Sequence, residues 1–319
     1  MSRSLYKSIF RAAFTVTLLV FVAACGDNQP PAAAPPTAAV AATPDAAIRK
    51  WIELLKQGDI AGLLQNAMPP AVFEQFKADW AREHNEKPIT DADRQKFAET
   101  MNELTAPDAE QKLYAQIEPQ LKQFDAQYQQ QIPMYVAMGT SWMQSTIQQN
   151  KELSDVDKQQ AMTVVNALGA WAQKTRFTDP DLVKQVLAIL VKAARDMNLK
   201  TLDEVHALSF EQSIQKARIA YLAVRDALNV YGLSIDQVLD SVKPEVIAND
   251  GKAAKVKISY ALLGAPISVE ASQMMNIDGR WYSKDIVDAY KKTAADTTQA
   301  PSTPPPGAAP ATDSAAKKN

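Results

Sequence analysis

Residues 254–262 read AKVKISYAL, a stretch in which apolar and polar side chains alternate. The apolar positions are Ala254, Val256, Ile258, Tyr260 and Leu262. A period of two residues predicts a β-strand with one covered face and one face in water. Lys255 and Lys257 belong to the wet face, which is the pattern of an antiparallel sheet covered on one side only.

Turn signals recur at regular spacing on both sides of this strand, at Asn249-Asp250-Gly251, Gly264-Ala265-Pro266 and Asp278-Gly279. Asp-Gly between extended runs is typical of a hairpin. We therefore expect a four-stranded antiparallel meander from about residue 242, followed by a short helix that begins at Ser283 or Lys284. The third strand should present one apolar face, interrupted at Gln273, made of Ile267, Val269, Ala271, Met275 and Ile277.

Helical signals dominate the chain before the meander, from residue 44 to residue 241. Residues able to cap helices precede several apolar runs, namely Thr43, Thr90, Ser154, Thr201 and Ser209. Pro119 and Pro133 should kink or end helices. Residues 182–197 are apolar at nearly every turn position, which predicts a helix buried on all sides.

The expected fold class is therefore α+β. A mostly helical bundle covers residues 44–241, and the four-stranded antiparallel meander with its short C-terminal helix covers 242–292 and packs on the bundle. Residues 26–43 and 293–319 are rich in Pro and Ala. Such segments cannot bury enough apolar surface to fold, so we expect a tether before the folded part and a disordered tail after it.

The N-terminus has the composition of a secretory signal. Arg3, Lys7 and Arg11 lead into AAFTVTLLVFVAA, which runs from Ala12 to Ala24 and ends in small residues. A membrane-spanning helix needs about 20 apolar residues, so this run is too short to be one. We expect residues 1–24 to be a cleaved signal, and Cys25 to begin the mature chain.

The tetrapeptide Val22-Ala23-Ala24-Cys25 resembles the lipobox of bacterial lipoproteins. The resemblance implies cleavage before Cys25 and acylation of that cysteine, palmitate included, with three acyl chains. In Gram-negative members of that family an Asp after the cysteine retains the protein in the inner membrane. Gly26 occupies this position here, so for a Gram-negative host the resemblance implies the outer membrane, on its periplasmic face.

A second resemblance concerns the fold. Lys56-Gln57-Gly58-Asp59 ends an amphipathic helix, and the stretch IDGRWY occupies residues 277–282. These features resemble small bacterial lipoproteins with a cystatin-like, or nuclear transport factor 2-like, fold, in which a helix packs across a curved antiparallel sheet. The resemblance covers 45–67 and 242–292; the helical residues between them depart from the pattern.

Charge and cysteine content limit what this chain can do. The chain has 34 basic and 36 acidic residues, and loss of the signal makes it more acidic. It therefore lacks the basic excess that is typical of nucleic-acid binding. Cys25 is the only cysteine, so the mature chain forms no intramolecular disulfide.

Residues that carry enzymatic chemistry are sparse. His84 and His206 are the only histidines, and no spacing matches a zinc or calcium site. Ser213-Ile214-Gln215-Lys216 resembles the SxxK of penicillin-recognising enzymes, but the accompanying KTG strand has no counterpart, so we interpret the match as chance. We expect no catalytic residue, metal site or cofactor, with His84 near a helix C-terminus and His206 half-buried on a helix.

Met134, Tyr135, Met138, Trp142 and Met143 recur at helical spacing. Methionines and aromatic residues can line an adaptable apolar site, but a stripe of this kind is more often plain core. We expect these side chains to lie in the core. The first four remain the candidate face for an apolar ligand or a partner.

These patterns predict a non-catalytic lipoprotein that acts as a binding or scaffolding module in the cell envelope. Its expected partners are the membrane, through acylated Cys25, and an envelope protein or small apolar ligand. One alternative is a carrier that holds a small apolar ligand in a pocket between the sheet and the helices. An enzyme of unknown type is the third hypothesis.

Overall fold

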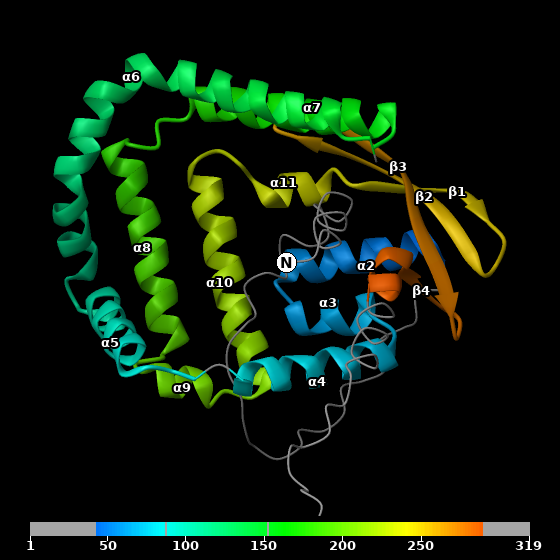
Figure 1. Ribbon diagram of the computed structural model, residues 1–319, viewed down its shortest axis with the longest axis horizontal. Coiled ribbons are helices and arrows are strands. Elements are labelled where there is room, and N and C mark those ends of the chain that lie inside the picture. Colours follow the sequence, from blue (N-terminus) through cyan, green and yellow to red (C-terminus); the bar gives the residue numbers. More distant parts are fainter. Residues whose placement is uncertain (1–42, 87, 152, 290–319) are drawn as a thin grey trace, which may run out of the picture.

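The computed structural model describes residues 43–86, 88–151 and 153–289 (Figure 1). The signal, the tether and the disordered tail were predicted for residues that lie almost entirely outside these ranges. The described chain is mostly helical as far as Asp240, and then forms an antiparallel sheet and a short helix. This order of elements confirms the expected α+β class.

Ten helices are described between Pro44 and Asp240. They are α2 (Pro44–Gln57), α3 (Ile60–Ala67), α4 (Pro70–Glu86), α5 (Asp91–Thr105), α6 (Ala109–Gln149), α7 (Asp155–Lys174), α8 (Pro180–Met197), α9 (Leu202–His206), α10 (Phe210–Val230) and α11 (Ile235–Asp240). Residues 284–289 form the helix after the sheet.

Side-chain caps begin these helices at the expected residues. Thr90, Thr201 and Ser209 each form a complete capping box, in which the N3 side chain returns a hydrogen bond to the cap backbone. The hydroxyl groups of Thr43 and Ser154 cap α2 and α7. Local sequence therefore sets where the helices start, independently of what they later pack against.

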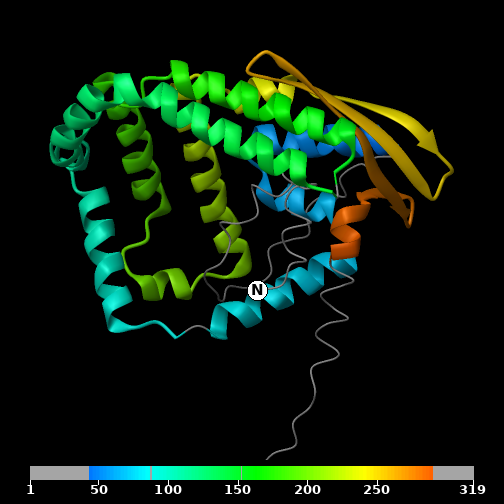
Figure 2. The same ribbon diagram turned by 45° about the horizontal axis from the view of Figure 1, so that its top comes forward.

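α6 is the longest described helix and contains both Pro119 and Pro133. It bends at the upper left of Figure 1 and then runs beside α7, an arrangement that Figure 2 also shows. Each proline removes one helical hydrogen bond and crowds the preceding turn, which favours a bend. The expected kink is present, but neither proline ends the helix.

The strands are β1 (Lys243–Asn249), β2 (Ala253–Leu262), β3 (Ala265–Ile277) and β4 (Arg280–Ser283). They pair antiparallel with their neighbours in the order β1-β2-β3-β4. Between β3 and β4, Asp278 and Gly279 have φ angles of 52° and 79°. A two-residue hairpin turn of this kind needs positive φ at both central positions, which explains the Asp-Gly pair.

α2 packs across the sheet and contacts β1, β2 and β4. The interface is filled by buried side chains from both layers, namely Ala47, Ile48, Ala254, Val256, Met274 and Trp281. Tyr260 and Ile267, further along the sheet, form another buried cluster with Val238 of α11. The alternation along β2 therefore corresponds to a covered face, as the sequence predicts.

A β-bulge changes which side chains of β3 face the core. Between two successive pairs of the β2–β3 ladder, β3 contains one residue more than β2. One extra residue moves all later side chains to the opposite face. Ile267, before the bulge, is 3% exposed, but after it Met274 rather than Met275 is buried, at 2%. The prediction of one continuous face ending in Met275 and Ile277 is therefore wrong.

α8 also differs from its prediction. Val183 and Val191 are buried, whereas Leu190 is 42% exposed. α8 contacts α5, α6 and α10, and these three neighbours leave part of its surface in solvent. The prediction of a helix buried on all sides is wrong, because the apolar residues extend beyond the faces that its neighbours cover.

A further core joins α3 and α10 through Ile60, Leu64, Phe210 and Ile214, and Phe73 of α4 packs against it. Ile286, in the helix after the sheet, packs against this cluster. The end of the described chain is thereby in contact with helices from its beginning and middle.

Candidate functional site

The second half of α6 is unusual in its lack of charge. From Ala126 to Asn150 the sequence contains no Asp, Glu, Lys or Arg; Asp125 and Lys151 flank this segment. Its polar residues are Gln, Ser, Thr and Asn150, together with two tyrosines. A solvent-facing helix normally carries charged side chains on its outer face, so the surface that this segment presents to solvent requires an explanation.

Four large side chains of this segment point into solvent. Met134 is 57% exposed, Tyr135 52%, Met138 59% and Trp142 70%. We call these four residues the α6 stripe. The expectation that they lie in the core is wrong, and the same holds for Met143, which is 40% exposed.

The stripe follows one ridge of the helix. Met134, Met138 and Trp142 are spaced four residues apart, so their side chains lie close to one line along the axis. At about 100° per residue, Val136, Thr140 and Ile147 lie on the opposite side. Ile147 is 3% exposed, so the stripe lies on the side of α6 that faces away from its packing partner.

That opposite side packs on α7 through apolar, small and polar residues together. A Cβ atom on Gly169 of α7 would lie 2.9 Å from Thr140 Oγ1 and 3.9 Å from Val136 Cγ1. Gln144 Nε2 donates to Asn166 Oδ1 at 2.8 Å. The close approach and the hydrogen bond hold α6 in one rotational setting, which keeps the stripe outward.

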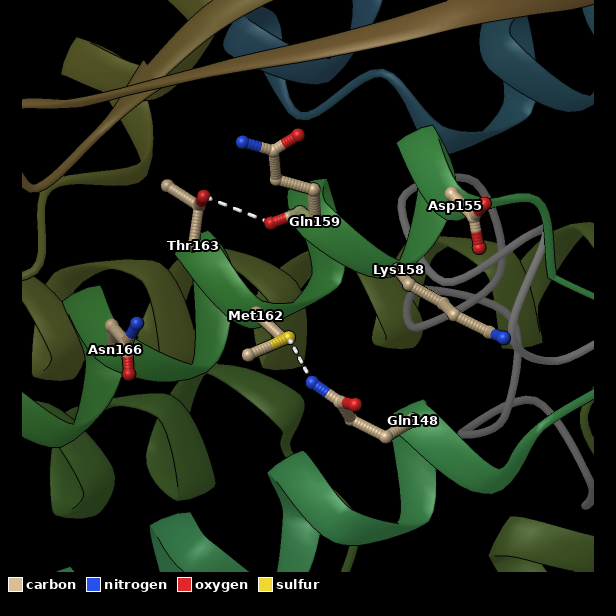
Figure 3. Close-up of a pocket in the computed structure, with 7 residues that line it drawn as sticks. All are labelled: Gln148, Asp155, Lys158, Gln159, Met162, Thr163 and Asn166. Carbon is tan, nitrogen blue, oxygen red and sulfur yellow. Dashed lines mark hydrogen bonds between the residues drawn. The ribbon is translucent and has the colours of Figure 1, made fainter.

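A shallow depression of about 440 Å³ lies between the C-terminal part of α6 and the N-terminal part of α7 (Figure 3). Its lining is mostly polar and consists of Gln148, Asp155, Lys158, Gln159, Met162, Thr163 and Asn166. Gln148 and Met162 point toward each other in Figure 3, and Gln148 Nε2 donates to Met162 Sδ at 3.5 Å.

The depression does not have the geometry of a nucleophile with its base. Thr163, a hydroxyl group that lines it, donates to the backbone carbonyl of Gln159 in its own helix, at 2.9 Å. This is a common helix contact for threonine. The depression is therefore a polar seam between two helices, open to solvent.

The two histidines meet, although 122 positions separate them. His84 of α4 is 8% exposed, and its Nε2 atom lies 2.9 Å from the backbone carbonyl oxygen of His206. The two ring centroids are 4.1 Å apart. Trp80 stacks on His84 at 5.1 Å and contacts Phe210 edge-on at 5.5 Å.

This aromatic cluster attaches α4 to α9 and α10, and its dense packing accounts for both histidines structurally. The positions expected from the sequence are correct, with His84 in the last turn of α4 and His206 half-buried on α9. Their contact was missed, since no local pattern links residues so far apart. Ser213 of the SxxK match is buried in α10 at 5% exposure.

Burial raises the pKa of three tyrosines, Tyr221, Tyr231 and Tyr260. The Tyr221 hydroxyl donates to the Leu55 carbonyl at 3.0 Å and so joins α10 to α2. The Tyr231 hydroxyl donates to the Phe177 carbonyl at 3.4 Å. Both phenols therefore link parts of the fold, and their raised pKa values follow from that burial.

The carrier hypothesis places an apolar ligand between the sheet and the helices. Between α2 and the sheet this space is filled by side chains: Val256 is 0% exposed, Met274 2% and Trp281 4%. Protein interiors of this kind are close-packed and leave little room for a guest. Among the described residues, a row of large side chains that are each more than half exposed lies instead on α6.

Cys25 and the preceding Val22, Ala23 and Ala24 lie outside the described residues, so lipidation remains a prediction. In the described ranges, no helix combines the length and apolar character needed to cross a membrane. The same residues contain no group of three or more His, Cys, Asp or Glu side chains that could hold a metal ion. Comparison of the chain with family models, curated proteins and solved structures finds no match. Function must be inferred from the residues themselves.

Proposed function

We propose that this protein is a lipid-anchored, non-catalytic binding or scaffolding module at the periplasmic face of the outer membrane, and that the α6 stripe is its binding surface. The observation that carries the proposal is the stripe itself. Three ridge residues and Tyr135 are each more than half exposed in a segment that lacks charge. Apolar surface of this kind on a soluble domain marks an interaction site more often than chance.

The surroundings of the stripe support this role. α6 is held against α7 by the Gly169 approach and the Gln144–Asn166 hydrogen bond. A binding surface on a rigid helix loses less conformational freedom on contact than one on a loop. Methionine side chains in particular adapt to partners of different shape.

The lipobox supports the other half of the proposal, the anchor. Cys25 is the only cysteine, and Gly26 follows it. Three acyl chains would hold the protein on the membrane essentially permanently, because each buried methylene adds about 0.8 kcal/mol of membrane affinity. The folded part would then remain near the bilayer for the lifetime of the protein.

Cell fractionation with a palmitate label tests the anchor. Cys25→Ser should abolish labelling and leave the protein unprocessed or soluble, because the acylated sulfur is lost. Undiminished labelling of the variant would refute the anchor.

Site-specific photo-crosslinking in intact cells tests the binding surface. A photoreactive amino acid in place of Met138 should form adducts, with lipid or with protein. The same amino acid in place of Val224 on α10, a residue that is 52% exposed, is the matched control. Equal adduct yields at the two positions would argue against the stripe as the binding surface.

A further inference from the structure

The composition of the α6 stripe indicates which kind of molecule binds it. Its members are two methionines, a tyrosine and a tryptophan, and the exposed polar residues around them are uncharged, among them Ser141, Ser145 and Gln149. Tyrosine and tryptophan have an apolar ring with a polar group at one edge, and they concentrate at the boundary between lipid chains and headgroups. Uncharged polar neighbours add no cost of charge desolvation in that environment.

We propose that the α6 stripe docks on the bilayer interface, with Met134, Met138 and Trp142 inserted at the boundary between headgroups and acyl chains. This inference rests on the proposed function, since it takes the membrane that holds Cys25 as the occupant. The three residues span about 12 Å of helix, at 1.5 Å per residue. A straight row of this length allows α6 to lie flat on a surface.

The chain between Cys25 and the fold brings the bilayer within reach of the stripe. The fold begins at Thr43, and a Pro-rich segment of this length spans up to roughly 55 Å at about 3.1 Å per residue. An anchor at that distance makes docking intramolecular, so a surface too weak to bind alone can be occupied most of the time. The small size of the stripe is consistent with such a tethered contact.

The absence of charge favours lipid over a protein partner or a second copy of the chain. Protein interfaces are commonly surrounded by a polar rim in which charged pairs fix orientation. The 126–150 segment offers no such charge. Interfacial helices that depend on anionic lipid carry Lys or Arg, so docking through this stripe should occur on zwitterionic lipid and should be insensitive to salt.

The fluorescence of Trp142 provides a direct test. Trp142 is 70% exposed, while Trp281 is 4% exposed and the other tryptophans are Trp51, Trp80 and Trp171, each partly buried. The chain from Cys25 to Asn319 is coupled through its only cysteine to a maleimide phospholipid in phosphatidylcholine vesicles that contain brominated acyl chains. Bromine quenches only tryptophan that enters the bilayer.

We expect quenching of the anchored chain, at low and at high salt, that Trp142→Phe removes. Met134→Ser with Met138→Ser should remove most of the quenching of the anchored chain, because the apolar area that the bilayer buries is lost. Val224→Ser on α10 is the control and should leave the quenching unchanged. Circular dichroism of each variant checks that α6 remains helical.

Three results would overturn the inference. The first is an anchored chain in which Trp142 is not quenched. The second is quenching that persists in full when both methionines are replaced. The third is a dimer that forms without a disulfide, that crosslinks at position 138, and in which a second copy of the chain buries the stripe. The anchor in this experiment is attached chemically, so the vesicle result does not depend on acylation in cells. A failure of cells to acylate Cys25 would therefore refute the proposed function without affecting the test of docking.

Discussion

Two regions of this molecule each contain a tryptophan, and the exposure of the two side chains is opposite. In the region formed by α2 and the sheet, Trp281 is 4% exposed; in the α6–α7 region, Trp142 is 70% exposed. In the first region apolar side chains from two layers meet. In the second, the side of α6 toward α7 carries Thr140, Val136, buried Ile147 and a hydrogen-bonded amide, and the row of Met134, Met138 and Trp142 lies outside the contact.

Apolar periodicity in a helix therefore identifies an apolar face, but it does not identify the element that covers that face. A helix normally turns its apolar face to the core. α6 turns to α7 a mixed face that carries Thr140, Val136 and Ile147, and leaves the α6 stripe in solvent. The free energy gained by burying the stripe is therefore still available for binding something else.

Replacing the two tryptophans by alanine should give the largest contrast. Trp281→Ala should lower the free energy of unfolding by about 3–5 kcal/mol, through lost burial and a cavity in the α2–sheet core. Trp142→Ala should change it by less than about 0.5 kcal/mol, because its side chain is already in water. Urea unfolding followed by circular dichroism measures both. If the two variants lost similar amounts of unfolding free energy, Trp142 would be as buried as Trp281, which would contradict the difference between the regions.

A smaller effect should separate the two faces of β2. Ile258 packs against two buried clusters, so Ile258→Ala should cost about 2 kcal/mol. Lys255, which is exposed, should tolerate alanine within about 0.5 kcal/mol. The same urea experiment would reveal an error of one residue in register, since that error exchanges the two outcomes.

Two glycines test the close contact between α6 and α7. Gly169→Leu should cost about 1–3 kcal/mol, because its Cβ would lie 2.9 Å from Thr140 Oγ1 and the helices would have to separate. At Gly139 of α6 no atom lies within 4 Å of the added Cβ. Gly139→Ala should therefore stabilise the helix, by about 0.5–1 kcal/mol. Thermal unfolding curves are the measurement, and destabilisation at Gly139 would contradict this account of the contact.

The smallest effect concerns acid pH in the sheet region. The Asp250 carboxylate accepts hydrogen bonds from the backbone N–H groups of Ala253 and Lys252, and these lower its pKa below the ordinary value of 3.8. A lowered folded pKa adds stability that is complete above 3.8 and is lost as the pH falls through the folded value. Asp250→Asn should remove this part of the pH dependence.

Urea midpoints of the native chain and of Asp250→Asn, measured across the acid range, test this expectation. The difference between the two chains should shrink as Asp250 becomes protonated. A difference that stays constant would show that the carboxylate charge does not matter to the β1–β2 turn.

Much of the fold could be predicted from local sequence. The capping residues Thr90, Thr201 and Ser209 mark helix starts correctly, and Asp278-Gly279 marks a hairpin. These features act within a few residues, so a single sequence displays them. The β3 bulge was missed because it depends on how two strands pair, and the result was the wrong choice between Met274 and Met275.

The sequence identified the residues of the candidate site but not their exposure to solvent. Met134, Tyr135, Met138 and Trp142 were singled out by spacing and then expected in the core, whereas they are exposed. No local pattern indicated their exposure, because residues 126–150 contain no charged side chain to mark a solvent face. Exposure depends on which face of α6 the neighbouring helix α7 covers.

Caps, alternation and the lipobox are local patterns. From them the sequence indicates where helices, strands and turns begin, and it predicts an acylated Cys25. Which apolar faces are covered follows from tertiary packing. This packing brings His84 into contact with His206 and leaves the α6 stripe in solvent. Burial depends on the surface that another element brings to a face, and because that element can lie anywhere along the chain, no local pattern reveals it.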